Sequence, residues 1–589
     1  MVQKILKKVY DNYSNKIVKY EDGSFRLNSK YKLGKIKIEN NSAIFEELFS
    51  TKRVQKIYID FDKLNGAYTD DIVVVQVLFN PKGKIKAKVI YIVEKAKRQV
   101  LCFVKDKELY SIKDGISIDC DIVNNQDGDV VIFDDDKIIS KLGNINNPAI
   151  DKAISLYLYD EFYRLDGFES FDIPTPSIKD RVDLTHLDFC TIDPALAKDH
   201  DDALYFDISS NTLYVAIADV SAYVLEGSSL DLEALKRSFS IYFPTEVLPM
   251  LPFELSSDIC SLVPNKQRLA YVFELKLEKQ TVKSAKLYEA IIKSKHKYSY
   301  EEIDNILEQN EQENYFVKFY NTMKKFRKKR LQNGYDFRSD ELLLCLDETS
   351  TLQTVITKHS SSSHSLVEEC MLLANQEAAK RLQNIGIFRV HTEPSLQKLK
   401  QLIDDVNLLG LKVKLQDDIH KTIQQIQQKA KDKGLEEEVD TLIIQSQQQA
   451  TYSSTRNIHF GLGFDNYSHF TSPIRRYSDL VLHRILKTGK IPKDIDNICE
   501  ILSQKERSIA SLVWDFEDRK FSRYCKEHIY EKFQAKIIDT QNHIAKTTTP
   551  IIGAKVDMLN YSGEKLFTTV DLTIKDVDII FKMIKVKII

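Results

Sequence analysis

The amino-acid sequence predicts an α+β protein of several domains, in which small β-barrels flank a central domain of mixed α/β structure. The chain has 589 residues, which is longer than a single hydrophobic core usually supports. Short β-branched runs separated by turn residues fill positions 31–145 and return at positions 531–589, whereas helical periodicity dominates between them. We therefore divide the chain into an N-terminal segment (1–30), two barrels (31–95 and 96–145), a central domain (146–530) and a third barrel (531–589).

The two N-terminal barrels are predicted from separate sets of strands. Pro81-Lys-Gly83 marks a turn between two strands of the first set. Strands of this length and spacing are typical of small barrels that bind oligonucleotides. The predicted strands are Lys35–Glu39, Ile57–Phe61, Asp71–Phe79 and Ala87–Val93 in the first barrel, and Gln99–Val104, Ile116–Ile122 and Asp129–Phe133 in the second.

The central domain is expected to mix strands with long helices. A helix is predicted within residues 145–170, and others within 396–450 and Ile495–Glu531. The Gln-rich segment 423–449 keeps an apolar stripe, so we expect an exposed helix pair there rather than disorder. The third barrel is predicted from the runs Ala535–Ile538, Gly553–Val556, Thr568–Ile574 and Phe581–Ile589.

The composition is that of a soluble globular protein in a reducing compartment. Hydrophobic residues make up 43% and charged residues 29% of the chain. No apolar run approaches the ~20 residues of a membrane span, and the N-terminus lacks the apolar segment of a signal peptide. The eight cysteines form no CxxC pair, which argues against a disulfide framework or a zinc site and predicts a cytoplasmic protein.

Net charge alone does not indicate a nucleic-acid partner, because the formal charge is −2. The basic run Lys324–Arg330 is expected to be mainly a solvated helix face, with a patch that contacts phosphate as the alternative.

The segment Thr191–Ala203 contains the first chemical motif, a run of four aspartates: Asp193, Asp199, Asp201 and Asp202. Two like charges about 4 Å apart repel by roughly 4 kcal/mol at an effective dielectric of 20, so clustered carboxylates need a counter-charge or a proton. Hard oxygen ligands of this kind suit Mg²⁺ or Mn²⁺.

The acidic run has two simpler interpretations. A solvated acidic loop is the commonest one, but the run lies between the apolar segments Leu187–Ile192 and Ala203–Phe206, both predicted to be strands. A calcium loop is disfavoured because the turn glycine and the closing glutamate of an EF-hand are both missing. The flanking strands favour a divalent-metal site.

The second motif is the segment His469–Arg484. Ser472-Pro473 is interpreted as a helix start, which would place Arg475 and Arg476 in the first helical turns. A helix N-terminus attracts phosphate, and arginine adds bidentate contacts. The alternative interpretation is a structural pair between an arginine and Asp479.

Together the two motifs resemble those of the RNB family of exoribonucleases, the ribonuclease II and ribonuclease R group, most closely the bacterial ribonuclease R type. The resemblance covers residues 180–520. It also includes, in the family's order, the segments Val215–Ser221, Arg237–Pro244, Pro249–Pro252, Leu255–Leu262, Glu368–Asn375, His391–Pro394 and Phe460–Leu462.

The resemblance implies roles for the matching residues. The four aspartates would hold Mg²⁺, with Mn²⁺ as the alternative, and Asp201 would be the most sensitive to substitution. Arg475 would contact the scissile phosphate, and Arg476 would also bind substrate. Tyr300 and one of Glu368 and Glu369 would contact the 3′ end of the RNA and its ribose, while Tyr242 would stack near the last bases.

The implied reaction is processive 3′→5′ hydrolysis of single-stranded RNA to nucleoside 5′-monophosphates. A contact with the 2′-hydroxyl would reject DNA, and the protein would act as a monomer without a membrane partner. Two other hypotheses remain: a catalytically silent RNA-binding member of the same fold, and an unrelated metal-dependent phosphodiesterase or translation-associated RNA binder.

The chain also departs from the family pattern. The usual Gly-x-Phe-Val core is absent from residues 535–589, which argues against RNA binding by the third barrel. Phe45 is the nearest candidate for a stacking aromatic in the first barrel. Leu342–Leu344 occupy the neighbourhood in which a second stacking aromatic of the central domain is expected.

Overall fold

The computed structural model divides into two compact units, Met1–Asn146 and Asn147–Ile589. It describes residues 2–13, 16–21, 23–39, 42–48, 57–78, 85–95, 99–122, 124–134, 137–159, 167–168, 171–337 and 341–589. The predicted turn Pro81–Gly83 lies outside the described residues. No helix in the described ranges is long and apolar enough to cross a membrane.

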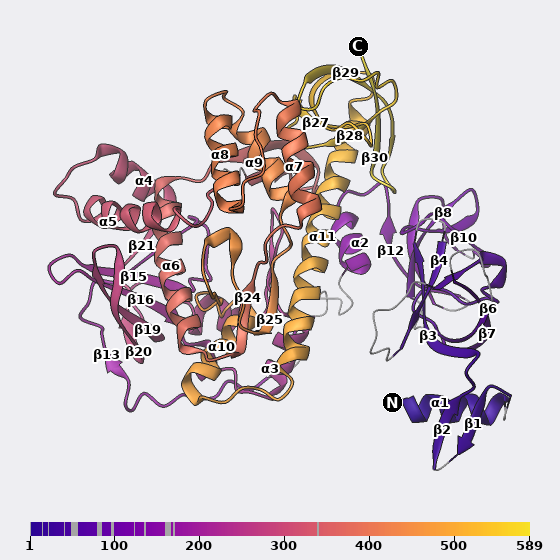
Figure 1. The fold of residues 1–589 in the computed structure, drawn as a ribbon, viewed down its shortest axis with the longest axis horizontal. Coiled ribbons are helices and arrows are strands. Elements are labelled where there is room, and N and C mark those ends of the chain that lie inside the picture. The colour runs from indigo at the N-terminus through magenta and orange to yellow at the C-terminus, as the bar shows by residue number, and fades with distance from the viewer. Residues whose placement is uncertain are drawn as a thin grey trace. The chain divides into compact units, whose positions relative to one another are not determined.

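The first unit begins with a helix and a hairpin and continues into two β-structures (Figure 1). The helix is α1 (Val2–Tyr13) and the hairpin joins β1 (Val18–Glu21) to β2 (Ser24–Leu27). A closed barrel follows, with strand order β3-β4-β5-β7-β6. Its strands are β3 (Tyr31–Glu39), β4 (Ser42–Glu47), β5 (Ile57–Ile59), β6 (Ile72–Leu78) and β7 (Lys86–Glu94).

The second β-structure of this unit is a five-stranded sheet with the order β10-β9-β8-β11-β12. Among the described residues β10 and β12 are its edges, so the closure expected of a second barrel is not seen there. The strands are β8 (Gln99–Lys105), β9 (Glu108–Ser111), β10 (Ser117–Ile118), β11 (Asp129–Asp134) and β12 (Lys137–Asn144).

Phe45 is not a stacking platform. Its side chain is 1% exposed and lies in the core of the first barrel, packed beneath Gly34 of the neighbouring strand. A Cβ atom at position 34 would lie 2.5 Å from the Phe45 ring, so the close approach needs glycine. The prediction was wrong because strand alternation turns this ring inward.

The second unit is built on a seven-stranded mixed sheet with the order β13-β20-β19-β16-β15-β14-β21. Its core combines apolar side chains of the sheet with those of the helices α6 (Ser362–Arg381) and α10 (Tyr477–Thr488). The strands are β13 (Val182–Asp183), β14 (Cys190–Asp193), β15 (Asp202–Asp207), β16 (Thr212–Ala218), β19 (Gln267–Glu278), β20 (Thr281–Lys293) and β21 (His296–Ser299).

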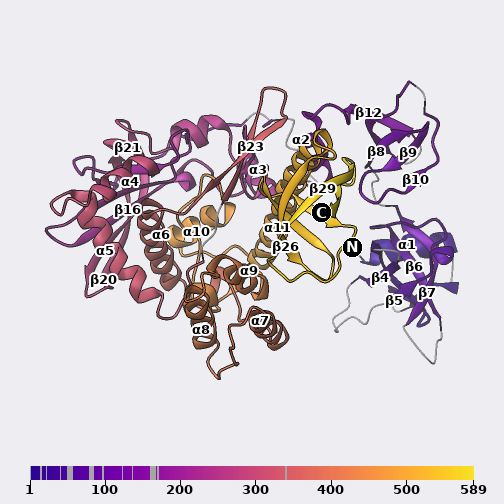
Figure 2. The same ribbon diagram turned by 90° about the horizontal axis from the view of Figure 1, so that it is seen from above.

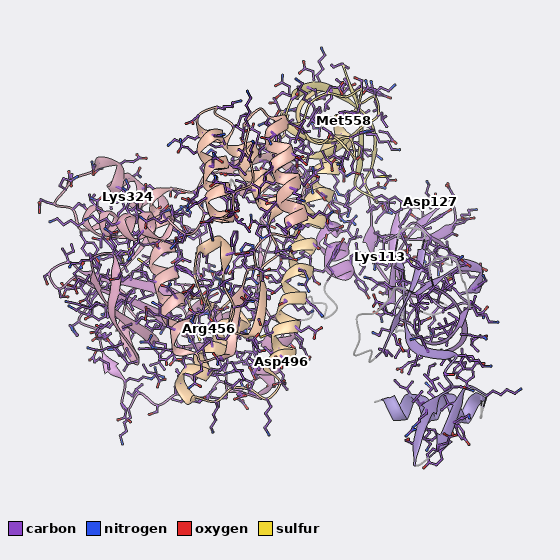
Figure 3. All side chains as sticks on the ribbon, viewed as in Figure 1. Lys113, Asp127, Lys324, Arg456, Asp496 and Met558 are labelled. Carbon is purple, nitrogen blue, oxygen red and sulfur yellow. The ribbon has the colours of Figure 1, made fainter. Side chains whose placement is uncertain are left out.

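Further helices accompany this sheet, and their side chains are drawn in Figure 3. The Gln-rich segment forms helices, as predicted, and its apolar stripe is buried in a satellite core with α7. Figure 2 shows α7, α8 and α9 grouped together. The helices are α2 (Ile150–Tyr159), α3 (Ser229–Arg237), α4 (Tyr300–Gln309), α5 (Tyr315–Arg330), α7 (Leu396–Leu408), α8 (Ile419–Lys431), α9 (Glu436–Ser446) and α11 (Ile495–Glu527).

Short elements complete the central domain. Three two-stranded pairs join β17 (Ile241–Tyr242) to β18 (Val247–Leu248), β22 (Glu341–Leu346) to β23 (Leu352–Lys358), and β24 (Ile385–Val390) to β25 (Thr451–Thr455). Single helical turns lie at Phe61–Lys63, Val220–Ala222, Glu254–Ile259 and Phe460–Leu462.

The C-terminal strands close into a barrel with the order β26-β27-β28-β30-β29. The core of this barrel also contains Phe521 and Cys525 of α11 and Leu344 of β22. Leu344 is therefore a core residue of the barrel. The strands are β26 (Lys532–Asp539), β27 (Ile544–Thr549), β28 (Lys555–Met558), β29 (Thr569–Asp578) and β30 (Met583–Ile588).

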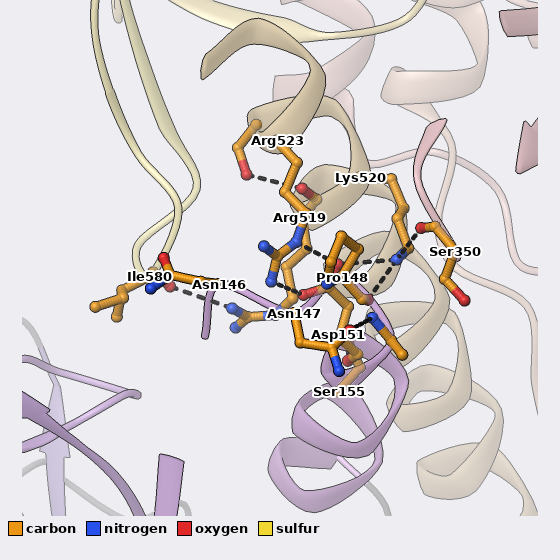
Figure 4. A network of polar contacts seen from close by, with 12 residues as sticks. Asn146, Asn147, Pro148, Asp151, Ser155, Ser350, Arg519, Lys520, Arg523 and Ile580 are labelled. Atoms are coloured by element: carbon orange, nitrogen blue, oxygen red, sulfur yellow. Dashed lines mark hydrogen bonds and ion pairs between the residues drawn. The ribbon is translucent and has the colours of Figure 1, made fainter. Parts of the chain in front are cut away.

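A buried ionic network joins α2, α11 and the C-terminal barrel (Figure 4). Asp151 of α2 accepts two hydrogen bonds from Arg523, at 2.8 and 2.7 Å, and lies 3.0 Å from the Lys520 ammonium. Lys520 and Arg523 belong to α11. Asp515, also on α11, binds Arg519 at 2.8 Å and pairs with Lys582 of the barrel. The network fixes α2 and the barrel to one helix.

Candidate active site

The acidic run lies at the ends of two adjacent inner strands of the central sheet. The chain leaves β14 at Asp193 and enters the neighbouring antiparallel strand β15 at Asp202, so the intervening loop projects from the ends of two adjacent strands. Ser261 Oγ donates to Lys198 O at 2.7 Å and accepts from His200 N at 3.0 Å. These contacts hold the loop against the domain.

Asp201 joins the two sequence motifs. Its carboxylate accepts a hydrogen bond from Ile474 N at 2.8 Å and from Arg475 Nε at 3.2 Å, and its side chain is 4% exposed. Burial raises the pKa of Asp201 to about 8, because the nearby guanidinium and backbone donor offset only part of the desolvation. The structure therefore brings the acidic run and Arg475 together.

The other three carboxylates differ in their partners. Asp193 Oδ2 lies 2.6 Å from His200 Nδ1, and Asp199 Oδ2 accepts from the Tyr242 hydroxyl at 2.7 Å. The Asp202 carboxylate accepts no hydrogen bond within the described residues. Burial, followed by the charges of Asp193 and Asp201, raises the pKa of Asp202 well above its ordinary value.

The carboxylate oxygens of the acidic run are ligands of the kind that a divalent cation prefers. Asp201 is buried and Asp202 is half-buried, and the pKa values of both are raised because the surrounding positive charge offsets only part of the desolvation. In the described part of the chain no three His, Cys, Asp or Glu side chains already form a metal cage. Carboxylate oxygens are ligands that suit Mg²⁺ and Mn²⁺.

His200 was not found by sequence reasoning. It is 2% exposed and binds Asp193, so it orients a carboxylate of the acidic run. Its position between Asp199 and Asp201 was the only available signal, and a single histidine inside an acidic run has no distinctive spacing.

The predicted helix start at Ser472-Pro473 is wrong. Residues 472–476 form a turn, and α10 begins only at Tyr477. Arg476 adopts extended dihedrals and forms a β-bridge with Phe239, while Arg475 O accepts from Ser240 N at 3.0 Å. Pairing with this second segment outweighs the local signals for a helix.

The two arginines of this motif have different environments. The Arg475 side chain is 43% exposed and reaches both Asp201 and Ser472 Oγ, the latter at 3.0 Å. Arg476 is bound to Asp479 through Nε at 3.0 Å and Nη2 at 2.7 Å. The structural pair considered for this motif thus exists at Arg476, and the Arg475 side chain is the more exposed of the two.

The predicted contacts for the 3′ end lie on α4 and α6. Tyr300 is the first residue of α4 and follows Ser299, which pairs with Asp193 of β14, so Tyr300 lies beside the acidic run. Burial, and then the charges of Asp202 and Asp193, raise the pKa of its phenol. Glu368 is 47% exposed and binds Arg327 at 2.6 Å. Glu369 is 3% exposed and pairs with Arg330 at 3.1 Å.

Tyr242 lies at the end of the short strand β17 and is 44% exposed. Its hydroxyl is bound to Asp199, so the ring is held over the acidic loop. An exposed aromatic ring with a fixed hydroxyl can stack on a base.

Comparison with known proteins defines the class to which this site belongs. A model described as the RNB domain matches residues 181–490, and a model described as the N-terminal first OB domain of ribonuclease R matches residues 1–88. The RNB model covers more than half of the chain, so the chain belongs to the RNB family.

Its similarity lies with the ribonuclease R proteins, and the chain is an exoribonuclease. Ribonuclease R of Helicobacter pylori strain 26695 is 36% identical over 472 residues, covering 75% of this chain and 72% of that protein. Ribonuclease R of Mycoplasma genitalium is 30% identical over 629 residues, covering 96% and 86%. RNB nucleases in general depend on divalent metal ions.

Solved structures show the same fold. Mycoplasma genitalium RNase R in complex with ribose-methylated single-stranded RNA has a TM-score of 0.80 at 24% identity and covers 95% of this chain and 100% of that one. Yeast Ssd1, described as a pseudonuclease, has a TM-score of 0.67 at 16% identity, with coverage of 90% and 79%. These likenesses establish architecture alone.

Proposed function

We propose that this protein degrades single-stranded RNA processively from the 3′ end, releasing nucleoside 5′-monophosphates with the help of Mg²⁺. The observation that carries the proposal is the contact of Asp201 with Ile474 N and Arg475 Nε, because it unites the acidic run with a partly exposed arginine. A silent RNA-binding member of the fold would not need this assembly.

Each residue of the site has a separate part in the proposed reaction. A divalent ion bound by Asp193, Asp199, Asp201 and Asp202 would supply an activated water and charge neutralisation. Arg475 binds the scissile phosphate and stabilises the charge that develops on its oxygens. Asp201 holds Arg475 in reach of that phosphate through its own hydrogen bond.

The RNA 3′ end is proposed to lie between α4 and α6. Tyr300 contacts the terminal nucleotide, and Glu368 is favoured over Glu369 as the ribose contact because the Glu369 carboxylate is buried against Arg330. A hydrogen bond to the 2′-hydroxyl would exclude DNA. Tyr242 stacks on a base and Arg476 acts by fixing the turn through Asp479.

The protein is proposed to act as a monomer in the cytoplasm. Its cysteines are all free thiols, with none in a disulfide, which is what a reducing compartment produces. The known RNA complex of the Mycoplasma relative supports single-stranded RNA as the substrate class.

The test is a time course on 5′-labelled RNA with Mg²⁺ and then with EDTA. The expected result is direct conversion to a short labelled end product in Mg²⁺ alone, without a ladder of intermediates. A parallel substrate with a 3′ duplex, with and without an overhang, shows whether structured RNA is degraded. Binding without cleavage in any divalent metal would instead support the silent RNA-binding alternative.

A further inference from the structure

A stacked pair of rings lies beside the acidic run, and only one of the two, Tyr300, has a part in the function proposed so far. The ring centroids of Tyr300 and His364 are 3.8 Å apart and the ring planes differ by 12°. The two residues are far apart in sequence and belong to different helices, since Tyr300 begins α4 and His364 lies in the first turn of α6.

The backbones that carry these rings are tied together. Ser299 and Glu302 form a capping box that fixes the start of α4. Asp304 of α4 accepts a hydrogen bond from Ser363 N of α6 at 2.8 Å. The His364 ring is fixed in turn, because its Nδ1 lies 2.6 Å from Ser361 Oγ.

The Tyr300 side chain has no comparable anchor of its own. Its hydroxyl makes no hydrogen bond within the described residues, so rotation of the phenol is restrained by packing and by the stack on His364. The hydroxyl is consequently available to a ligand. Because Ser299 of β21 pairs with Asp193 of β14, Tyr300 follows directly beside the acidic run, and that ligand would lie next to the four aspartates.

The α6 helix places His364 on the side proposed to receive RNA. Glu368 follows His364 by four residues, so both side chains share one face of α6. Lys358, at the end of β23, lies with its ammonium 5.7 Å from the centre of the Tyr300 ring. The stack therefore borders the pocket in which the terminal nucleotide is proposed to bind.

The charge state of His364 suits a stack of two neutral rings. Burial lowers the pKa of His364, and the charge of Lys358 lowers it further, whereas Asp304, Glu341 and Glu301 act in the opposite direction. The imidazole is therefore neutral at neutral pH.

We propose that His364 is a positioning residue, which holds the Tyr300 phenol in the orientation that contacts the 3′-terminal nucleotide. This inference rests on the proposed function, because Tyr300 is assigned to the RNA only there. A stack that served packing alone would stabilise the fold without changing what Tyr300 contributes to cleavage.

The experiment compares His364→Ala, His364→Phe, Tyr300→Ala and the double variant His364→Ala/Tyr300→Ala in single-turnover cleavage of labelled RNA. His528→Ala is the matched control, since His528 stacks on Tyr524 at 4.2 Å and 17° at the end of α11. A second measurement uses 3-fluorotyrosine placed at position 300 alone and follows its ¹⁹F resonance with and without His364.

We expect His364→Ala to slow cleavage by roughly 10- to 100-fold, the size of effect that misplacing a contact produces, and His364→Phe to restore most of the rate. The double variant should cleave RNA at nearly the same rate as Tyr300→Ala alone, because His364 acts through Tyr300. The ¹⁹F resonance shifts or broadens with His364→Ala and is unchanged with His528→Ala.

Three results would overturn the inference. The first is that His364→Ala slows cleavage as much in the Tyr300→Ala variant as in the unaltered protein. The others are a ¹⁹F resonance that His364→Ala does not change, and a normal cleavage rate for Tyr300→Ala. Failure of the proposed function looks different, because the unaltered protein would then cleave no RNA. In that case the ¹⁹F measurement still decides whether His364 positions the phenol.

Discussion

Two clusters of buried carboxylates in the second unit differ in the positive charge that surrounds them. At the α2–α11 junction Asp151 and Asp515 are bound by arginines and lysines, and the guanidinium of Arg519 helps to lower the pKa of Asp515 despite its burial. In the acidic run, one guanidinium, that of Arg475, is bound to Asp201, and the Asp202 carboxylate has no hydrogen-bond donor among the described residues. Their pKa values are raised.

The difference separates structural from catalytic carboxylates. In a buried ion pair the two charges compensate each other, and the pair holds the elements that carry them together. Removal of one partner leaves the other charge buried without compensation. A buried carboxylate that lacks a partner is costly to the fold, and such groups gather at functional sites. The two clusters therefore predict opposite consequences for the same substitution of Asp by Asn.

The largest effect is expected for Asp201→Asn. The amide keeps an oxygen for Ile474 N but loses the charge that would bind a cation and hold Arg475, so we expect cleavage to fall by more than roughly 1,000-fold. RNA binding and the melting temperature should stay near those of the unaltered protein. Single-turnover cleavage and filter binding measure the two properties, and cleavage at the normal rate would remove Asp201 from the catalytic assignment.

The matching substitution at the junction, Asp151→Asn, should damage stability and spare the chemistry. Lys520 and Arg523 would lose their buried counter-charge, a change that typically costs about 3–5 kcal/mol. Urea unfolding measures the loss, and cleavage per folded molecule should not change.

The control for Asp151→Asn is Asp576→Asn. Asp576 is 64% exposed in its pair with Lys585, so the expected loss is under about 1 kcal/mol. Equal losses at the two positions would mean that burial does not govern the strength of these pairs.

Arg475→Ala tests the arginine that binds Asp201 of the acidic run. Loss of a preorganised donor to a developing charge costs about 3–4 kcal/mol of transition-state stabilisation, which is on the order of 100- to 1,000-fold in kcat/KM. Arg475→Lys should recover part of this because it keeps the charge without the two-pronged geometry. An unchanged kcat/KM for the alanine variant would exclude the proposed role.

The sequence was sufficient for the parts of the site that local pattern determines. Apolar runs on both sides of the four aspartates predicted strands, and β14 and β15 end and begin at Asp193 and Asp202. Contacts between distant segments were not readable: the bridge from Arg476 to Phe239 delays α10, and Arg330 decides that Glu369 is buried.

Single side chains were hardest to predict where partners far along the chain decide their orientation. Phe45 packs beneath Gly34 of the neighbouring strand, and His364 matters only because Tyr300 lies against it. Neither relation has a spacing that a sequence can display. The fold class and the order of the parts depend on many residues and were predictable, whereas these pairs each depend on one contact.

The smallest effect is expected for a carboxylate that shares α11 with Asp515. Glu517 follows Asp515 on α11, but it lies beside Asp518 rather than an arginine, and burial raises the pKa of Glu517 to about 7. The folded protein thus holds a proton that the unfolded chain has already released, so the free energy of unfolding falls as the pH rises from the ordinary glutamate pKa of 4.5 toward 7.

Glu517→Gln should remove this dependence and leave the protein more stable than the unaltered chain above pH 7, by on the order of 1 kcal/mol because the group is partly solvated. Urea unfolding across that pH range measures the difference, with the exposed Glu531→Gln as the control. If Glu517→Gln and the unaltered chain follow the same pH profile, Glu517 is compensated like Asp515, and the contrast between paired and unpaired carboxylates does not extend along α11.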